Sequence, residues 1–390
     1  MKEGWEYKKL GEVIEHLRTG LNPRTHFKLN TPDAEGYYVT VRELKGFAIE
    51  PDEKTDKVNK SAIKRINERS NLKIGDVLFS GTGTIGKTAL VTELPENWNI
   101  KEGVYAMTPK HSELDSKYFI YYIGSDLFLR LVNDKAAGTG VRSIPMKELV
   151  KLPISVPPLS EQQSIVDYLD SAFAKIDAMK ANAEKALDEA KALFQASLKE
   201  MLEPEEGWNV KPLKEICRVI NGRAYSKDEM LKQGKYRLLR VGNFFTNDSW
   251  YYSDLELEED KYCDNGDLLY AWSASFGPRI WDGEKVIYHY HIWKMVCSAE
   301  IDKYFMCYWL DSDELKKQTM TNLHGATMAH ITKGIIEAAH VSFPSLPEQQ
   351  SIVTTLDSLK SKVDRLQENY DKISQECDAL KQAILRQVFE

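Results

Sequence analysis

The sequence has few cysteines and no long apolar run. Its five cysteines are scattered, odd in number and include no C-x-x-C pair: Cys217, Cys263, Cys297, Cys307 and Cys377. This pattern argues against a disulfide framework or a zinc site and favours a reducing cytoplasm. No stretch of about 18 apolar residues occurs, so no transmembrane helix is expected. Residues 1–5 lack the apolar core of a secretion signal.

Positive charge is in deficit overall but is concentrated in two places. The 390 residues carry 52 Lys and Arg against 59 Asp and Glu, for a formal net charge of −7. Residues 54–73 nevertheless hold seven basic residues against two acidic ones, and residues 211–240 hold nine against three. Because phosphate binding depends on local charge, a nucleic-acid partner is not excluded.

The chain repeats itself once. Its length predicts two or three domains, and a composition with 42% hydrophobic residues excludes global disorder. Three pairs of matching segments follow in the same order: 4–13 with 207–216, 75–79 with 266–270, and 159–166 with 346–353. Ordered matches of this kind indicate a tandem repeat.

Each half is expected to contain a mixed α+β segment followed by a long polar helix. Shorter helices are predicted to begin near Asp115 and Asp302, where an acidic residue precedes an apolar-periodic stretch. Strands are expected where β-branched and aromatic residues lie between turn signals: 37–41, 76–80, 88–92, 103–107, 237–241, 267–271 and 286–296.

The two long helices show heptad spacing, which predicts a coiled coil. Ser160, with Glu161 to Gln163 behind it, resembles a helix N-cap. The first seam is read at Ile165, Leu169, Ala172, Ile176, Met179, Ala183, Ala186, Ala190, Leu193 and Ser197. The second is read at Ile352, Leu356, Leu359, Val363, Leu366, Tyr370, Ile373, Cys377, Leu380 and Ile384. The alternative is two amphipathic helices that pack on their own domains.

The predicted fold class is α+β. Two tandem α/β domains, related by a pseudo-twofold axis, would be separated by a long antiparallel two-helix coiled coil. The expected boundaries are 1–159 and 204–346 for the two domains, and 160–203 and 347–390 for the two helices.

One glycine-rich segment fits the phosphate-binding pattern G-x-x-x-x-G-K-[ST]. It reads Gly81-Thr82-Gly83-Thr84-Ile85-Gly86-Lys87-Thr88 and follows a predicted strand. A nucleotide site would need a helix next, whereas residues 88–95 form a short β-like run that ends in proline. A hairpin loop is therefore favoured, and its backbone N–H groups and Lys87 could still meet a nucleic-acid phosphate.

Other catalytic or metal-binding readings are weaker. His289 and His291 would share one face of a strand, but no third ligand has suggestive spacing, so an aromatic role is favoured. The tetrad and glycine-rich cofactor loop that a DNA aminomethyltransferase would need are absent. We expect no catalytic residues, no bound metal and no cofactor in this chain.

Candidate DNA-contacting residues come from the basic runs and from the aromatic or glycine-rich loops near them. They are Lys60, Lys64, Arg65, Thr82, Thr84, Lys87, Thr139, Arg142, Arg223, Arg240, Trp272, Ser273, Arg279, His324 and Thr327. Two similar but non-identical domains suit a split, asymmetric DNA site.

The tandem organisation and the twin helix starts resemble the specificity subunits of type I restriction-modification systems. The first start reads Pro157-Pro158-Leu159-Ser160-Glu161-Gln162-Gln163, and residues 344–350 match it less completely. The resemblance implies two target-recognition domains and a non-catalytic subunit of an adenine-N6 methyltransferase/endonuclease complex. It also implies double-stranded DNA and two methyltransferase subunits as partners, with restriction/translocase subunits possible. S-adenosylmethionine, and ATP with Mg²⁺, would then belong to those partner subunits.

A second apolar stripe on the helices is predicted to bind partner subunits. Its residues are Phe173, Leu187, Phe194 and Leu198 on the first helix, and Leu385 and Phe389 on the second. The alternative is packing on the chain's own domains. Two other functions stay open: a nucleotide-dependent enzyme that uses residues 81–88, and a coiled-coil scaffold that does not bind DNA.

Overall fold

The computed structural model describes residues 4–138, 140–245, 247–273, 275–320 and 331–390, and they form two compact units. Unit 1 contains Met1–Ala183 and Asp371–Glu390, and unit 2 contains Glu184–Tyr370. Each unit therefore contains part of both long helices. The four predicted segments differ from this division, because they give each long helix a segment of its own. None of the described helices is long and apolar enough to cross a membrane.

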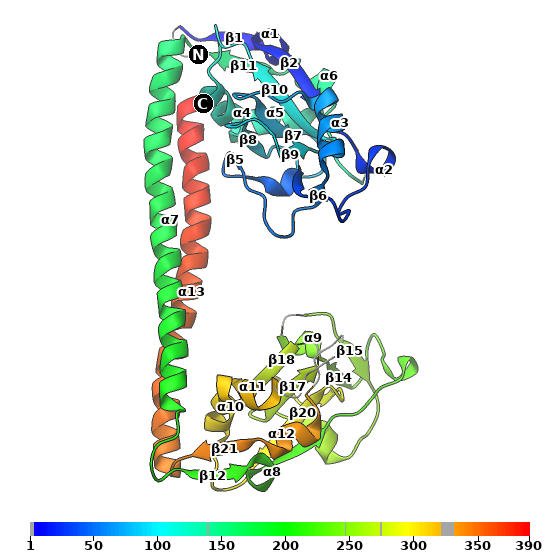
Figure 1. The fold of residues 1–390 in the computed structure, drawn as a ribbon, viewed down its shortest axis with the longest axis vertical. Helices are drawn as coiled ribbons and strands as arrows, with labels where there is room; N and C mark the ends of the chain where they lie inside the picture. Colours follow the sequence, from blue (N-terminus) through cyan, green and yellow to red (C-terminus); the bar gives the residue numbers. More distant parts are fainter. Residues whose placement is uncertain (1–3, 139, 246, 274, 321–330) are drawn as a thin grey trace. The chain divides into compact units, whose positions relative to one another are not determined.

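Unit 1 is an α+β fold built on a four-stranded antiparallel sheet (Figure 1). Its order is β2 (Ile14–Thr19), β10 (Val104–Pro109), β7 (Val77–Ser80), β8 (Thr88–Leu90). A second sheet has the order β6 (Lys57–Val58), β3 (Gly36–Val39), β9 (Trp98–Ile100), and two-stranded sheets join β1 (Glu6–Lys9) to β11 (Pro153–Val156) and β4 (Leu44–Lys45) to β5 (Ala48–Ile49). The helices are α1 (Leu10–Val13), α2 (Pro23–His26), α3 (Lys60–Ser70), α4 (Ser116–Ile123), α5 (Asp126–Lys135) and α6 (Met146–Leu149), with a 3-10 turn at Val41–Glu43.

Unit 2 repeats this plan. Its main antiparallel sheet has the order β13 (Cys217–Asn221), β20 (Ile292–Cys297), β17 (Leu268–Ser273), β18 (Ser275–Ile280). The second sheet is β15 (Tyr251–Ser253), β14 (Tyr236–Leu239), β19 (Val286–Tyr288), β16 (Tyr262–Cys263), and β12 (Asn209–Pro212) pairs with β21 (His340–Phe343). The helices are α8 (Leu213–Ile216), α9 (Val241–Phe245), α10 (Lys303–Asp311), α11 (Asp313–Met320) and α12 (Lys333–Ala338), with 3-10 turns at Lys227–Glu229 and Glu259–Lys261.

The predicted elements are largely confirmed. Each expected strand overlaps an observed one, except that 286–296 divides into β19 and β20. Asp115 caps α4 by accepting hydrogen bonds from two backbone N–H groups, and Asp302 caps α10 in the same way. The fold class, α+β with two tandem copies and two long helices, is confirmed.

A buried glutamine at the start of each long helix ties that helix to its own unit. In unit 1, the Gln162 side-chain oxygen accepts from the Asp115 backbone N–H at 2.8 Å, and its amide nitrogen donates to the carbonyls of Glu113 and Pro157. In unit 2, Gln349 makes the same three contacts, with Asp302, Glu300 and Pro344. Both side chains are fully buried, so the repeated motif is structural because it satisfies polar groups that would otherwise be costly to bury.

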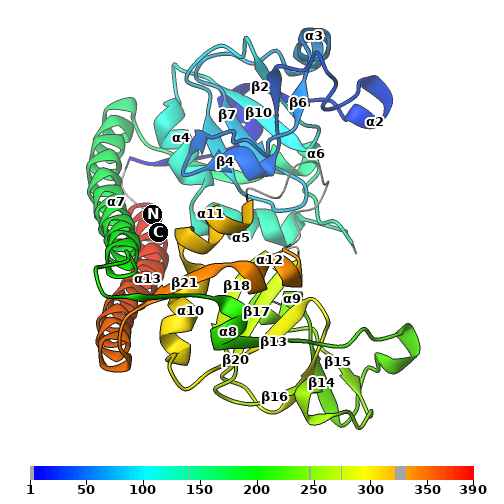
Figure 2. The same cartoon turned by 60° about the horizontal axis from the view of Figure 1, so that its bottom comes forward.

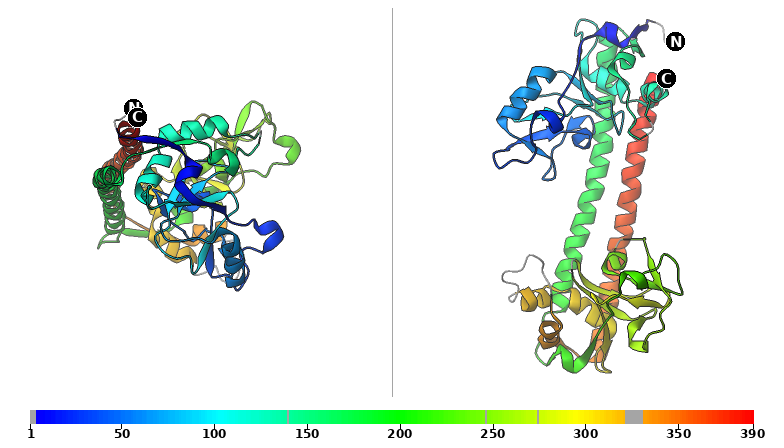
Figure 3. Two further views of the ribbon diagram at one scale, coloured as in Figure 1. Left: turned by 90° about the horizontal axis from the view of Figure 1, so that it is seen from above. Right: turned by 90° about the vertical axis from the view of Figure 1, so that its right-hand side faces the viewer.

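The long helices α7 (Leu159–Met201) and α13 (Leu346–Phe389) pair in each unit and run antiparallel (Figure 3). In unit 1 the N-terminal half of α7 meets the C-terminal end of α13, where Lys381 pairs with Asp177 at 2.5 Å. In unit 2 the C-terminal half of α7 meets the N-terminal part of α13, where Lys191 donates to Gln367 at 2.8 Å. The antiparallel pairing agrees with the predicted coiled coil.

The seam of α7 was predicted wrongly in one of its two rows. Leu169 and Ile176 are buried as expected, but Met179 and Leu193 are 59% and 60% exposed. The second buried row lies one residue further along, at Val166, Phe173 and Leu187. The heptad period is kept, but Val166 and Phe173 of this row pack in the core of unit 1. They bury more apolar area there than the row with two alanines would.

Most of the predicted partner-binding stripe is buried within the chain, which corrects that expectation. Five of its side chains are at most 6% exposed: Phe173, Leu187, Leu198, Leu385 and Phe389. Phe194 is partly buried against the core of unit 2, with its ring 6.4 Å from that of Tyr308. Packing on the chain's own domains, the alternative prediction, describes all of these residues except Leu187, which is buried outside the two main core clusters.

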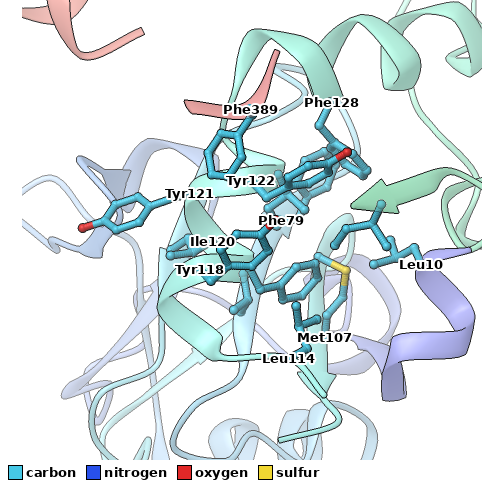
Figure 4. Packing of buried hydrophobic residues seen from close by; sticks show 14 of the residues in the cluster. Leu10, Phe79, Met107, Leu114, Tyr118, Ile120, Tyr121, Tyr122, Phe128 and Phe389 are labelled. Carbon is cyan, nitrogen blue, oxygen red and sulfur yellow. The ribbon is translucent and has the colours of Figure 1, made fainter. Parts of the chain in front are cut away.

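The core of unit 1 joins the sheet, α4, α5 and both long helices. Phe389 lies against the rings of Tyr118 and Tyr122, at 5.7 and 5.2 Å (Figure 4). In unit 2, α10 lies between the main sheet and the long helices (Figure 2), and Phe305 and Trp309 belong to the same buried cluster as Leu356. Each core thus includes side chains from both long helices.

Candidate nucleic-acid interface

The glycine-rich segment of unit 1 forms an exposed loop between the antiparallel strands β7 and β8. The Gly83 backbone N–H donates to the Arg142 carbonyl at 2.8 Å, so the loop lies beside the segment 137–144. The structure therefore brings together Thr82, Thr84, Lys87 and Arg142, all of which are exposed. This grouping offers hydroxyl and ammonium donors, which suit phosphates and base edges. The Arg142 guanidinium also donates to the Asn133 carbonyl at 3.0 Å.

The same geometry favours the hairpin reading over a nucleotide site. After Lys87 the chain enters β8, which pairs with β7, so the loop leads into a strand and not into the helix that a nucleotide site needs. Gly86 has a φ of +96°, and a Cβ atom there would lie 2.4 Å from a methyl carbon of Leu129. The glycine is thus required by the turn and its packing.

Helix α3 presents a basic face next to α2. Asn59 caps the helix by accepting from the Ala62 N–H, while Ile63 and Ile66 are buried beneath it. Lys60, Lys64 and Arg65 lie on its exposed side. Arg65 donates to the His26 carbonyl of α2 at 2.9 Å, whereas Lys60 and Lys64 form no ion pair with any residue that the structure describes. These two ammonium groups are available to phosphates.

Three predicted contacts in unit 2 are disfavoured. Arg223 forms a double hydrogen bond with Glu229, at 2.7 and 3.0 Å, and this contact, with the Ser226 N–H, lowers the pKa of Glu229 to about 2. Arg279 donates to the Phe244 carbonyl and to Asp282. Ser273 is only 5% exposed. Sequence spacing could not reveal these acidic partners or this burial.

Arg240, just after β14 of the second sheet, and Trp272, in β17 of the main sheet, instead lie beside exposed aromatic side chains. Trp272 is paired across the strands with Phe276, and its indole N–H donates to the Tyr290 carbonyl at 2.8 Å. Arg240 lies over the ring of Tyr251 at 5.3 Å. Phe276, Tyr290 and Tyr251 are 38–39% exposed, and exposed rings suit stacking or apolar contact with nucleotide bases.

Phe276, Tyr290 and Tyr251 were not predicted from the sequence, because the basic runs that guided the prediction do not contain them. For Tyr290, a usable signal was the alternating segment Tyr288-His289-Tyr290-His291 at the end of β19.

The rings of His289 and His291 lie 4.8 Å apart. Burial, with His291 and Arg240 nearby, lowers the pKa of His289 to about 4. Among the described residues no group of three or more His, Cys, Asp or Glu could hold a metal ion.

Three predicted contacts, Thr139, His324 and Thr327, lie outside the described residues.

The fold defines a class of protein with two tandem α+β units, each of which contains part of two long antiparallel helices. The chain belongs to the type I restriction modification DNA specificity domain family, whose model matches residues 2–188 and again 205–375. The resemblance read from the sequence is confirmed, and the chain has two recognition domains.

Curated relatives and solved structures agree. The MjaVIII specificity subunit of Methanocaldococcus jannaschii is 24% identical over 93% of this chain and 87% of its own length. The EcoKI specificity subunit of Escherichia coli is 24% identical over 70% of this chain and 65% of its own length. A chain from a study of assembly and conformational transition of the type I R-M system aligns over 100% of this chain and 98% of its own, with a TM-score of 0.73 and 18% identity. The HsdS subunit from Thermoanaerobacter tengcongensis aligns over 100% of this chain and 97% of its own, with a TM-score of 0.53 and 18% identity.

Proposed function

We propose that this chain gives a type I restriction-modification complex its DNA sequence specificity, with each unit reading one half of a bipartite, asymmetric site. It is not itself a catalyst in this proposal. Methyltransferase subunits that use S-adenosylmethionine would methylate adenine N6, and restriction/translocase subunits would use ATP with Mg²⁺. A DNA partner and five free thiols support a cytoplasmic location.

One observation carries the proposal of an asymmetric site. The ends at which β7 is followed by β8 in unit 1, and β17 by β18 in unit 2, occupy the same place in equivalent sheets. In unit 1 this place holds Thr82, Thr84 and Lys87, whereas in unit 2 it holds Trp272 and Phe276. Hydrogen-bond donors and aromatic rings favour different base edges, so two different half-sites are expected.

Neutralising the basic face of α3 should weaken DNA binding without changing the recognised sequence. In the variant Lys60→Gln/Lys64→Gln/Arg65→Gln, each lost phosphate contact should make the dependence of log K on log salt shallower by about 0.9. Affinity should be measured by fluorescence anisotropy at several salt concentrations, on target and non-target duplexes.

The matched control is Lys175→Gln/Lys185→Gln, which removes exposed charges from α7 and should leave the slope unchanged. An unchanged slope in the α3 variant would remove this helix from the interface. If the unaltered chain with its partners shows no salt-dependent DNA binding, the result contradicts the proposal and supports a coiled-coil scaffold that does not bind DNA.

The methyltransferase subunits would dock on apolar side chains that the helix pair leaves uncovered. Met179 of α7 and Leu380 of α13 are 59% and 47% exposed in unit 1, and Leu193 is 60% exposed in unit 2. Exposed apolar residues on a helix are candidate interface anchors. We propose these three exposed side chains as docking residues in place of the predicted stripe, which is buried within the chain.

Met179→Glu should therefore weaken docking by about 2 kcal/mol or more, roughly a 30-fold rise in Kd, because a charge would be buried in an apolar contact. Ser171→Glu adds the same charge at an exposed polar position of α7 and should have little effect. Calorimetric titration with the methyltransferase subunit distinguishes the two variants. Equal affinities would exclude Met179 from the interface.

A further inference from the structure

Two cysteines face each other across neighbouring strands of unit 2. Cys217 begins β13, Cys297 ends β20, and the two are direct partners in the antiparallel register. The Ser298 N–H donates to the Ile216 carbonyl at 2.8 Å just outside them, so they form a non-hydrogen-bonded pair. The Cα atoms of such pairs are about 4.5 Å apart, and disulfides span about 4.4–6.8 Å.

The two cysteines are cross-strand neighbours with different surroundings. The neighbouring Cys297 thiol and burial both raise the pKa of Cys217. The neighbouring Cys217 thiol and the positive charge of Lys303 lower the pKa of Cys297, whereas burial and the negative charge of Asp302 raise it. Cys297 is therefore the thiol of the pair that lies beside Lys303, whose positive charge favours a thiolate.

Cys297 is also the more accessible thiol. It is partly exposed, whereas Cys217 is 3% exposed. Cys297 lines an open cavity of about 390 Å³, together with Met295, Asp302 and Lys303. A small oxidant can reach the nucleophilic sulfur through this cavity.

The other cysteines lack this arrangement. Cys263 is buried opposite Val286, and Cys377 is buried with its sulfur near the Ile176 carbonyl at 3.8 Å. Cys307 is partly buried in α10, and burial raises the pKa of its thiol. It resembles Cys297 in exposure but has no neighbouring cysteine among the groups that set its pKa.

The geometry points to a reversibly oxidisable dithiol, in which a hydroperoxide oxidises Cys297 and Cys217 resolves the product to a cross-strand disulfide. The Cys297 thiolate attacks one peroxide oxygen, the O–O bond breaks, and the leaving oxygen takes a proton. Cys297 is then a sulfenic acid. The Cys217 sulfur attacks the Cys297 sulfur, the S–S bond forms, and the hydroxyl leaves with the Cys217 proton as water. The peroxide is reduced by two electrons, and a thiol reductant reverses the oxidation.

Hydrogen peroxide treatment of the full chain tests this site. Two of the five thiols should be lost, peptide mass spectrometry should find Cys217 linked to Cys297, and dithiothreitol should restore both. In Cys217→Ser, dimedone should trap a sulfenic acid at Cys297, because no resolving thiol remains. Cys307→Ser is the matched control and should oxidise like the unaltered chain.

The cross-link in the unaltered chain is decisive, because it does not depend on how any variant folds. If no Cys217–Cys297 peptide forms, or if Cys297 is oxidised no faster than Cys307, the proposal is overturned. Neither result bears on DNA recognition, since the assay uses no DNA and no partner subunit.

Discussion

Inserting one heptad into α7 after Ala183 and one into α13 after Tyr370 is expected to lengthen the recognised DNA spacer by about three base pairs. Both insertion points fall where the chain divides into its two units, so neither core is interrupted. A heptad keeps the buried row in register and adds about 10 Å of helix, and base pairs are about 3.4 Å apart. The half-site bases should not change, because neither recognition surface is altered.

Methylome sequencing of cells that express the variant with its methyltransferase partner measures this change. The control carries seven extra residues after Glu205, in the exposed connection between α7 and β12, and should methylate the original site. An insertion variant that folds and keeps the original spacer would show that the helices do not determine the spacing.

Phe389→Ala is expected to destabilise unit 1 by about 3–5 kcal/mol, because it removes a buried aromatic ring and leaves a cavity. The side chain is 6% exposed and makes edge contacts with the rings of Tyr118 and Tyr122. The loss should appear in denaturant unfolding as an earlier transition of unit 1.

Leu380→Ala provides the comparison, because it shortens an apolar side chain of the same helix that is 47% exposed. Its effect on the free energy of unfolding should be below about 1 kcal/mol, as is usual for exposed positions. Similar losses for both variants would mean that α13 contributes to stability through helix formation rather than through the contacts of Phe389.

The order of the helices and strands could be predicted from the sequence because matching segments occur in the same order in its two halves. Asp115 and Asp302 head equivalent helices, and the caps that they form are local, so adjacent residues suffice to identify them. The seam row of α7 could not be chosen this way. Residues 172 and 173 are both apolar, and only the tertiary contact of Phe173 with the rings of Phe47 and Tyr121 decides which one is buried.

The candidate site was harder to predict because availability depends on distant partners. Lys87 and Arg142 are far apart in sequence, yet their loops are joined by a backbone hydrogen bond. The sequence makes Arg223 a candidate phosphate ligand, but in the structure its guanidinium forms an ion pair with Glu229. Phe276 lies in β18 and Tyr290 in the turn between β19 and β20, and neither position in the sequence shows that the folded chain leaves the ring exposed.

The composition of unit 1 has a consequence for how the chain is made. Its core includes Cys377, Leu385 and Phe389, which a ribosome adds only after residues 184–370 of unit 2 have been synthesised. At about 5–20 residues per second, that delay is on the order of 10–40 s. Unit 1 therefore emerges first but completes its core last, and during translation its unfilled apolar surface is exposed to chaperones and proteases.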